Sequence, residues 1–591
     1  MLAIKCHNTL FYGRYIKLAA VLLATMPMAY ALEPQIDPAR PSSQPLKLPE
    51  PASNHTNDGL KLPTKTEGMN KSLSRKDGIL QIHRIRFEGN KVIPVEELLA
   101  IARPFLDRPL KAIDLEQLRH ELSLHYVRKG YINSGAQIPE QSIQSGELLV
   151  QIIEGHLSDI KITDVTGQTS PYRLWGLRDG YIRDRLMPNG ADPLNTVELQ
   201  EKYTRLLNDR LIERLNGTLL PGLHPGESVL DLKVVRARPY GGYLGVDNYA
   251  PPQIGGISGK LGIWADNLTT LGDRIDFNIR PSQGAFSYNT GLELPLSSYG
   301  TRFGFRYSNA ETSLIEPPEN VGDFTNNIIS YDAQLSHPVL WDLKNKLTLG
   351  ANFAVRQNLS LIAGEPFIEG EAKDGWTTAT VVRTWQDYLN QSDYFDLAMR
   401  STFSMGIDAL GATIPQDNSA GIGSGEFFAW LGQGSARYRV LDNGAYISAS
   451  GAVQLTPNRL LSLEKMALGG FGTIRGFRQN YLVKDEGFYV SLDLGYPVYG
   501  GGSSSRYGIF IVPFTDYGGG GNQDNNYTYL QSVGLGLEGY LKVYESTLST
   551  SLYWAGRLSD KYRGNRGSFG PGKPYDLQDN GINFEVNLSS F

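Results

Sequence analysis

The feature that most constrains this chain is an alternation of apolar and polar side chains that recurs from Arg236 to the C-terminus. In residues 274–280, isoleucine and phenylalanine take every second position, while aspartate and asparagine take the positions between them. The same alternation returns in residues 488–496, with serine, aspartate and glycine on the polar side. A period of two residues places the apolar side chains on one face of a β-strand. The C-terminal part of the chain is therefore predicted to be almost entirely β-sheet.

Two architectures could cover the apolar face of these strands, a sandwich of two packed sheets or a barrel surrounded by lipid. A sandwich rarely sustains the alternation over a stretch as long as residues 237–591. Asp442-Asn443-Gly444 indicates a short hairpin turn, whereas residues 417–425 and 518–526 are rich in Gly, Asn and Asp and are expected to be external loops. We therefore predict a transmembrane antiparallel β-barrel over residues 237–591, with ~16 strands at roughly 22 residues for each strand and its connection.

The composition agrees with a membrane barrel and argues against a nucleic-acid binder. A mean hydropathy of -0.28 is compatible with a barrel, because only alternate residues face lipid. The 32 Tyr and 22 Phe could supply the aromatic girdles of such a barrel. With 56 Lys and Arg against 61 Asp and Glu, the formal net charge is -5, which does not favour binding to phosphates.

Residues 1–31 have the pattern of a secretory signal peptide. Basic residues precede an apolar run at residues 18–28, and Ala29-Tyr30-Ala31 provides an A-x-A cleavage site. A membrane anchor is the competing interpretation, but the run is too short for a spanning helix, which needs ~20 apolar residues. The only cysteine, Cys6, would leave with the peptide, so the mature chain would have no disulfide.

A linker and a first small α/β module are expected next. Residues 32–78 contain frequent prolines, which interrupt any helix or strand pattern and predict an extended linker. Residues 79–156 show the order β-α-α-β-β, in which the second helix opens at Asp114 with Gln117 at a capping-box spacing. The predicted elements are a strand near 84–88, helices over 95–102 and from Asp114 to Gly130, and strands over 131–138 and 147–154.

Residues 157–236 repeat the same order of elements. A strand passes through Ile160 and Ile162, a helix follows Ser170-Pro171, and a second helix is capped by Asn195 with Glu198 three residues later. Strands near 211–220 and 229–235 complete the copy. The chain is therefore predicted to be mainly β, with two small α/β domains before the barrel.

A search for catalytic and cofactor-binding motifs points away from an enzyme. The eight His residues are scattered, and no H-E-x-x-H or paired metal-ligand spacing occurs, so neither a metal nor a catalytic residue is predicted. The segment GSFGPGKP resembles a phosphate-binding loop, yet Pro574 stands where such a loop needs Ser or Thr. No cofactor is therefore expected, although an outer-membrane esterase with a Ser and a His brought together in the fold is not excluded by spacing alone.

Four segments before the barrel carry a recognisable pattern: RFEGNKV, YVRKGYINSGAQIPEQ, GELLVQIIEG and TLLPGLHPGESVLDLKV. They resemble POTRA domains of the two-partner secretion transporters, the outer-membrane family of the haemolysin and filamentous-haemagglutinin transporters. The resemblance implies two POTRA domains in the periplasm, which receive an unfolded client, and an exposed sheet edge could bind an extended peptide as an added strand. The motif residues that it singles out are Gly89, Asn90, Tyr126, Gly130, Tyr131, Pro139, Gly155, Pro221 and Gly222.

The most specific resemblance is the segment GGFGTIRGFRQN at residues 469–480, which is similar to the pore-loop motif of that family. Phe514-Thr515-Asp516 is similar to the matching motif of the barrel wall, and the resemblance implies that Arg475 pairs with Asp516. An Arg fork can bind a carboxylate bidentately, so such a pair would fix the loop; the alternative is a solvated arginine and an ordinary pore-facing acid. The motif residues of the loop are Gly469, Gly470, Ile474, Arg475, Gly476 and Phe477.

The resemblance also implies the partners and the function. The C-terminal Phe591 matches the terminal aromatic residue that the barrel-assembly machinery recognises. Its position in the alternation would place it on the opposite strand face from the apolar residues before it, and a bulge near Ser589 would reconcile the two. The expected function is a pore in outer-membrane lipid that secretes a partner exoprotein, an adhesin, a cytolysin or a toxin, to the cell surface. The alternatives are an assembly factor of the same superfamily and, from another class, a porin or an outer-membrane enzyme.

Overall fold

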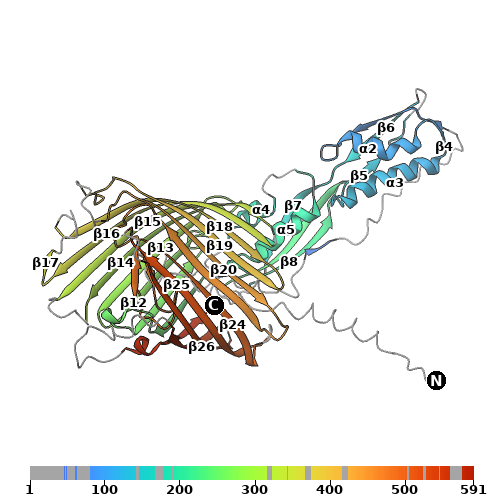
Figure 1. Ribbon diagram of the computed structural model, residues 1–591. Helices are drawn as coiled ribbons and strands as arrows, with labels where there is room; N and C mark the ends of the chain where they lie inside the picture. Colours follow the sequence, from blue (N-terminus) through green and yellow to red (C-terminus); the bar gives the residue numbers. More distant parts are fainter. Residues whose placement is uncertain are drawn as a thin grey trace, which may run out of the picture. The chain divides into compact units, whose positions relative to one another are not determined.

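The fold divides into two compact units at Ala237 and Arg238. The structure is a computed structural model that describes residues 46, 48, 60–62, 80–141, 146–166, 177–187, 192–315, 323–342, 344–366, 374–415, 423–501, 505–523, 527–544, 546–558 and 576–590. The first unit contains two α/β modules and the second is a closed β-barrel (Figure 1). None of the helices in these described ranges is both long and apolar enough to cross a membrane.

The first module folds in the predicted order. Its three-stranded sheet has the order β3-β6-β5, with β3 and β6 parallel, and its core contains the fully buried Leu118, Leu122 and Tyr126 of the longer helix. A leucine or tyrosine every three or four residues places these side chains on one helix face, toward the sheet. The elements are β2 (Leu80–Gln81), β3 (Arg84–Glu88), α2 (Val95–Ala102), η2 (Arg103–Phe105), β4 (Pro109–Leu110), α3 (Ala112–Arg128), β5 (Gly135–Gln137) and β6 (Glu147–Ile153).

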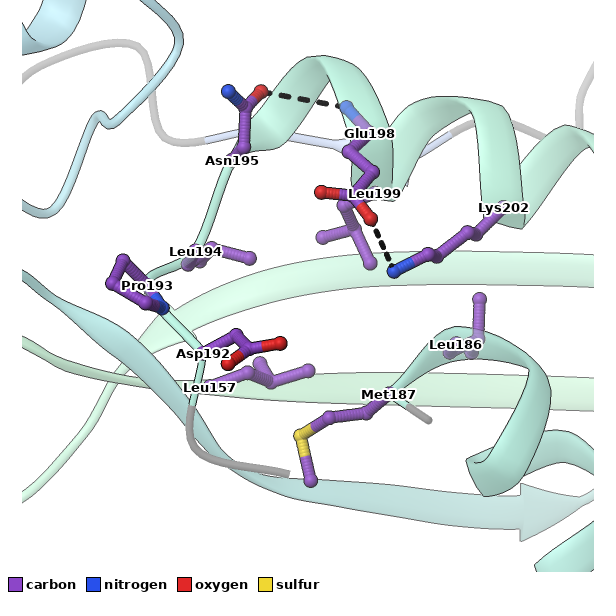
Figure 2. Close-up of a pocket in the computed structure, with 10 residues that line it drawn as sticks. All are labelled: Leu157, Leu186, Met187, Asp192, Pro193, Leu194, Asn195, Glu198, Leu199 and Lys202. Carbon is purple, nitrogen blue, oxygen red and sulfur yellow. Dashed lines mark hydrogen bonds and ion pairs between the residues drawn. The ribbon is translucent and has the colours of Figure 1, made fainter. Parts of the chain in front are cut away.

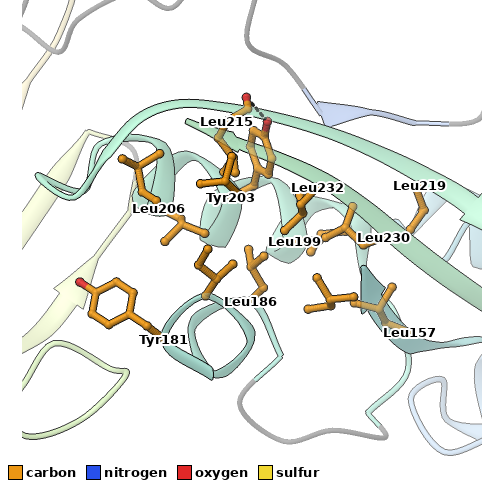
Figure 3. Packing of buried hydrophobic residues seen from close by; sticks show 14 of the residues in the cluster. Leu157, Tyr181, Leu186, Leu199, Tyr203, Leu206, Leu215, Leu219, Leu230 and Leu232 are labelled. Atoms are coloured by element: carbon orange, nitrogen blue, oxygen red, sulfur yellow. Dashed lines mark hydrogen bonds between the residues drawn. The ribbon is translucent and has the colours of Figure 1, made fainter. Parts of the chain in front are cut away.

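The second module repeats this order with longer strands. Figure 3 shows its core, in which Leu199, Tyr203 and Leu206, all from one helix, lie opposite leucines of the sheet. The Asn195 side chain caps this helix, as predicted, by accepting hydrogen bonds from the backbone N–H groups of Val197 and Glu198. The elements are β7 (His156–Asp164), α4 (Asp179–Leu186), α5 (Thr196–Leu207), β8 (Ile212–Pro221) and β9 (Glu227–Arg236).

A short strand of the linker extends the sheet of the second module. The strand order is β1-β8-β9-β7, and β1 (Leu60–Lys61) pairs with β8 in parallel. Leu60 lies opposite Gly217 and packs against the module core. The prediction that prolines prevent any strand in residues 32–78 is therefore wrong at this point, because two residues are enough to pair with an open sheet edge.

Among the described residues, sixteen long strands close the barrel. The two-residue strand β17 (Glu365–Pro366) adds to one hairpin. The first and last strands, β10 and β28, pair in an antiparallel ladder that closes the sheet. In barrel order the strands are β10 (Tyr240–Asp247), β11 (Ser258–Asp266), β12 (Arg274–Pro281), β13 (Ala285–Pro295), β14 (Arg302–Ser313), β15 (Phe324–Trp341), β16 (Asn345–Ile362), β18 (Trp376–Gln391), β19 (Phe395–Gly406), β20 (Phe428–Arg439), β21 (Tyr446–Leu455), β24 (Glu486–Gly500), β25 (Tyr507–Gly521), β26 (Thr528–Val543), β27 (Ser546–Arg557) and β28 (Ile582–Ser590).

The alternation in the sequence separates an apolar outer face of the barrel from a polar lumen. On β24, Val490 and Leu492 are exposed on the outside, while Ser491 between them is buried. On β12, Phe277 is exposed and Asp276 is buried. Outward apolar side chains suit lipid, and inward polar side chains can pair with one another across neighbouring strands.

Several predicted boundaries differ from the structure. The first-module strand expected over 131–138 contains only Gly135–Gln137. Helix α3 begins at Ala112, so Asp114 is not its cap; its carboxylate instead accepts a hydrogen bond from the backbone N–H of Lys111. The capping interaction therefore runs from the Asp114 side chain in the first helical turn to the backbone of the preceding Lys111, and Gln117 takes no part in it.

One prediction for the barrel is also wrong. The segment 518–526 is expected to be a loop, but β25 continues through Gly521. Strand β28 keeps its register with β10 through Ser590, so the described part of this strand has no bulge near Ser589 or Ser590 that would reconcile the parity of Phe591. The helix predicted after Ser170-Pro171 is α4, which begins at Asp179; residues 167–176 and the terminal Phe591 lie outside the described residues.

Candidate functional site

The candidate site is the long connection between β21 and β24, residues 456–485, which we call the pore loop. It contains a small hairpin formed by β22 (Met466–Leu468) and β23 (Leu482–Lys484). The loop folds inside the barrel, because its apolar side chains form one buried cluster with side chains on the inner face of the wall. This cluster comprises Met466, Leu468, Ile474 and Phe477 of the loop with Leu431, Ala452, Tyr489 and Leu530 of the wall.

The glycines of the predicted motif allow the tight path of the loop. Gly469, Gly470 and Gly476 all have positive φ, at 102°, 95° and 92°. A Cβ atom on Gly469 would also lie 2.7 Å from the backbone oxygen of Arg478, on the returning part of the loop. Any other residue at these positions would be strained, so the glycines permit the turn that presents Arg475 to the wall.

Arg475 contacts Asp516 of β25 through three hydrogen bonds. Its Nε donates to Oδ2 at 2.9 Å and its Nη2 donates to Oδ1 at 2.7 Å. Its backbone N–H also donates to Oδ2 at 2.8 Å. The structure thus brings together the two residues that the family resemblance paired, in the bidentate geometry expected of an Arg–carboxylate pair.

Further wall groups surround the same guanidinium. Nη2 of Arg475 also donates to Ser491 Oγ at 2.7 Å and to Asp493 Oδ1 at 2.8 Å, both on β24. The guanidinium carbon lies 3.5 Å from the centre of the Phe514 ring and 5.2 Å from that of Tyr553. Arg475 is therefore held by charge, by hydrogen bonds and by stacking on aromatic rings.

Burial determines how strongly this contact fixes the loop. Arg475 is 6% exposed and Asp516 is fully buried, so neither charge can be solvated if its partner is removed. Loss of one member of a buried pair typically costs about 3–5 kcal/mol, because an uncompensated charge is left behind. The contact can therefore act as a latch that holds the pore loop on the lumen wall.

Sequence reasoning missed a second set of contacts from the same loop. Arg478 makes two 2.6 Å hydrogen bonds to Asp579, in the short helix η6 (Leu577–Asn580) that precedes β28. The backbone N–H of Gln479 donates to the side chain of Gln578 at 2.7 Å. Ser491 and Asp493 were recognisable as polar members of an alternating strand, but nothing in the sequence marked Arg478 or Gln578 as contact residues.

The POTRA motif residues of the first module stabilise its turns. Gly89 has a φ of 91°, and the Asn90 side chain donates to the Ile93 carbonyl at 3.1 Å. The Tyr126 hydroxyl donates to Glu154 at 3.1 Å, and its ring packs edge-on against Tyr131. These residues hold the module together.

Other motif residues join the two modules. The Gly130 carbonyl accepts hydrogen bonds from both the backbone N–H and the hydroxyl of Thr196, each at 2.9 Å. The Asn133 side chain donates to the Gly226 carbonyl at 3.0 Å, and the Gly155 carbonyl accepts from the backbone N–H of Leu194 at 2.7 Å. The remaining motif residues lie in turns: the Pro139 carbonyl accepts from Gln141, Pro221 ends β8, and Gly222 closes the β8–β9 hairpin.

A small pocket in the second module offers no set of groups suited to catalysis. Figure 2 shows its apolar lining from β7 and the helices, with Asn195, Glu198 and Lys202 at α5. Three of its four polar side chains stabilise the helix itself, since Asn195 caps it and Glu198 pairs with Lys202 at 2.6 Å; the fourth, Asp192, is exposed. Across the described ranges, no group of three or more His, Cys, Asp or Glu side chains is arranged to hold a metal ion.

Comparison with known proteins now identifies the family. Residues 80–155 match the ShlB-type POTRA domain. Residues 226–539, more than half of the 591 residues, match the family described as haemolysin secretion/activation protein ShlB/FhaC/HecB. The chain belongs to the ShlB/FhaC/HecB family.

Several known transporters are similar in sequence to this chain over most of its length. The outer membrane transporter CdiB of Dickeya dadantii is 24% identical over 70% of this chain and 72% of its own length. The heme/hemopexin transporter protein HuxB of Haemophilus influenzae is 23% identical over 76% of this chain and 79% of its own length. The structure of CdiB from Escherichia coli, at 19% identity, superposes with a TM-score of 0.66 and covers 89% of this chain and 93% of that one.

The family membership assigns the protein to a location and a general role. It is a transporter of the two-partner secretion class in the outer membrane, and its POTRA domains lie in the periplasm. The predicted fold class, with a barrel of about 16 strands after small α/β domains, is confirmed. The pore loop therefore occupies part of the lumen of a protein-secreting barrel.

Proposed function

We propose that this protein binds an unfolded partner exoprotein at its periplasmic modules and passes it through the barrel to the cell surface after the pore loop leaves its latched position. The observation that supports the proposal best is the Arg475–Asp516 contact inside the lumen, because it fixes a loop in the path that a client would take. The predicted boundaries, with a signal peptide at 1–31, a linker at 32–78, POTRA domains at 79–156 and 157–236 and the barrel at 237–591, belong to the same proposal.

The β8 edge of the second module provides a physical basis for client binding. The linker strand β1 pairs with this edge in parallel, with Leu60 opposite Gly217 and Lys61 opposite Thr218. This pairing shows that the β8 edge accepts an added strand, and an extended client peptide could pair with the edge beside β1 or in its place. The client is thus proposed to bind by strand addition. This mode requires an extended client backbone but little specificity for the client's sequence.

The proposal includes no chemical step on the client. The buried charge of Arg475 in the pore loop pairs with the buried Asp516 of the barrel wall, which gives these groups a structural role in the proposal. Direction would come from folding of the exoprotein outside the cell, which removes the unfolded chain from the equilibrium. Outer-membrane lipid and the barrel-assembly machinery, through Phe591, are the other proposed partners.

The test is surface release of a co-expressed candidate exoprotein encoded by a neighbouring reading frame. The intact protein is compared with a deletion of residues 80–236, with R475A, and with D276N as a control. D276N weakens the Asp276–Arg306 pair, which joins two wall strands away from the pore loop. Release should require the modules and tolerate D276N, at equal barrel levels in the outer membrane, whereas R475A removes the latch and should not by itself block release. Release that continues without residues 80–236 would contradict the proposal.

A further inference from the structure

Glu464 of the pore loop makes a buried ionic contact that the sequence motifs do not include. It is 6% exposed and lies two residues before the start of the hairpin strand β22. Nη2 of Arg383 donates to its two carboxylate oxygens at 2.8 and 2.7 Å. Nη1 of Arg356 lies 3.5 Å from the nearer oxygen. Both arginines are also buried, at 5% exposure, so the three charges form a compact group away from solvent.

This contact lies on a different sector of the barrel wall from Asp516. Arg356 is on β16 and Arg383 is on β18, and these two strands are neighbours. Asp516 is on β25, and β19, β20, β21 and β24 separate β18 from β25 in the closed barrel. Because Glu464 and Arg475 belong to one loop, that loop extends across the lumen between the two sectors.

The surrounding contacts position Glu464 accurately. The Gln454 side chain donates to the Glu464 carbonyl at 3.0 Å, and so connects it to β21. Leu460 and Leu461, just before it in the loop, belong to a buried cluster with Ala379 and Val381 of β18. The carboxylate therefore reaches the two arginines from a fixed backbone, which reduces the entropy lost in forming the pair.

The charges are reversed relative to the Arg475 contact. There the loop contributes the cation and the wall the acids, whereas here the loop contributes the acid and the wall two cations. Without Glu464, Arg356 and Arg383 would be two like charges buried on adjacent strands, which is unfavourable. The wall at β16 and β18 is thus built to receive an acidic group.

We propose that Glu464, Arg383 and Arg356 form a second latch, and that the two latches together hold the pore loop in the lumen. Opening the Arg475 latch alone leaves the loop attached to β18, and opening the Glu464 latch alone leaves it attached to β25. Passage of a client is the proposed function and requires release of both. The latch itself is a property of the loop and is measurable without any client.

A buried cysteine reports the position of the loop. Ala467 in β22 is 1% exposed, and the sequence's single cysteine, Cys6, lies in the predicted signal peptide. The variant A467C therefore provides one site for a thiol reagent that reacts only when the hairpin leaves the wall. Its labelling rate and the channel conductance in planar bilayers are measured in four further backgrounds: E464Q, E464R, R383E and the exchange E464R/R383E.

The expected order of labelling follows from the charges. E464Q keeps the side-chain shape but loses the charge, and should raise the rate; E464R places a third cation beside two and should raise it by about tenfold or more, with a larger conductance. R383E should also raise it. The exchange E464R/R383E keeps the total charge of the trio and should return the rate to within about twofold of the A467C parent.

A matched control removes an ionic pair that does not involve the loop. D387N weakens the pair of Asp387 with Arg400, which joins β18 and β19 within the wall, and should leave labelling and conductance unchanged. If E464Q and E464R leave the labelling rate unchanged, or if the exchange fails to restore it in a folded barrel, the second latch is wrong. Because neither readout uses an exoprotein, a failure of the secretion proposal would not produce these results.

Discussion

Replacement of Asp516 by asparagine is the sharpest perturbation of the first latch. D516N keeps the shape of the side chain and removes the charge that faces Arg475. The carboxylate accepts three hydrogen bonds from Arg475, at 2.8, 2.9 and 2.7 Å. Hydrogen bonds to charged groups contribute about 1.5–3 kcal/mol each, and the amide oxygen retains part of this set. We expect loop docking to weaken by about 3 kcal/mol, which corresponds to a change of about 100-fold in the docking equilibrium.

The neighbouring acid provides a graded comparison. Asp493 accepts one hydrogen bond from Arg475, at 2.8 Å, and is more exposed to the lumen than Asp516. D493N should therefore weaken docking by only about 1.5 kcal/mol, or about tenfold. The double variant D516N/D493N leaves the guanidinium without an acid and should have a larger effect than either single change.

Thiol labelling of A467C measures these effects in outer membranes that contain equal amounts of folded barrel. The expected order of rates is parent, D493N, D516N and then the double variant, with D276N equal to the parent. A D516N rate equal to that of the parent, or a larger effect of D493N than of D516N, would refute the assignment of Asp516 as the main partner of Arg475.

Three further predictions concern other parts of the chain. In G217V the new side chain would meet Tyr203 at 2.9 Å and Leu60 at 3.0 Å, so β1 should leave the β8 edge and the linker should be cut faster by protease near Leu60; an unchanged rate would contradict β1 docking. Hydrogen bonds from Lys129 and His125 hold the pKa of the Glu97 carboxyl below its ordinary value of 4.5. The stability that these hydrogen bonds contribute is therefore present above pH 4.5 and is lost as the pH falls through the lower pKa of the folded state. In acid, the α2–α3 contact should show less protection from hydrogen exchange. The variant E97Q should lack this pH dependence. Deletion of Phe591 should lower the amount of heat-modifiable barrel in the outer membrane, while an unchanged amount would remove its role as an assembly signal.

The sequence predicts those parts of the fold that depend on local periodicity. The alternation over residues 274–280 and 488–496 places the correct side chains inside and outside the barrel, because lipid and lumen impose the same period on every strand. The Asn195 cap and the α2 boundaries follow from local hydrogen bonding and are equally predictable. The family resemblance, and not periodicity, supplies the pairing of Arg475 with Asp516.

The errors arise where distant segments determine the local conformation. Residues 518–521 were expected to start a loop because they are glycines, yet they are in strand β25. A Cβ atom on Gly518 would lie 2.8 Å from Ile474, and one on Gly520 would lie 3.0 Å from Lys484, so these glycines make room for the pore loop. Glu464 was missed for the same reason, because its arginines are remote in sequence and no local pattern connects them.

The most direct test of the account follows release of the exoprotein and labelling of A467C in the same cells. Co-expression of a secreted partner should raise the labelling of A467C, because a client can pass only when the loop has left both latches. No rise is expected in cells in which residues 80–236 are deleted. An exoprotein released in full while A467C stays as protected as in cells without a client would contradict the claim that the pore loop closes the secretion path.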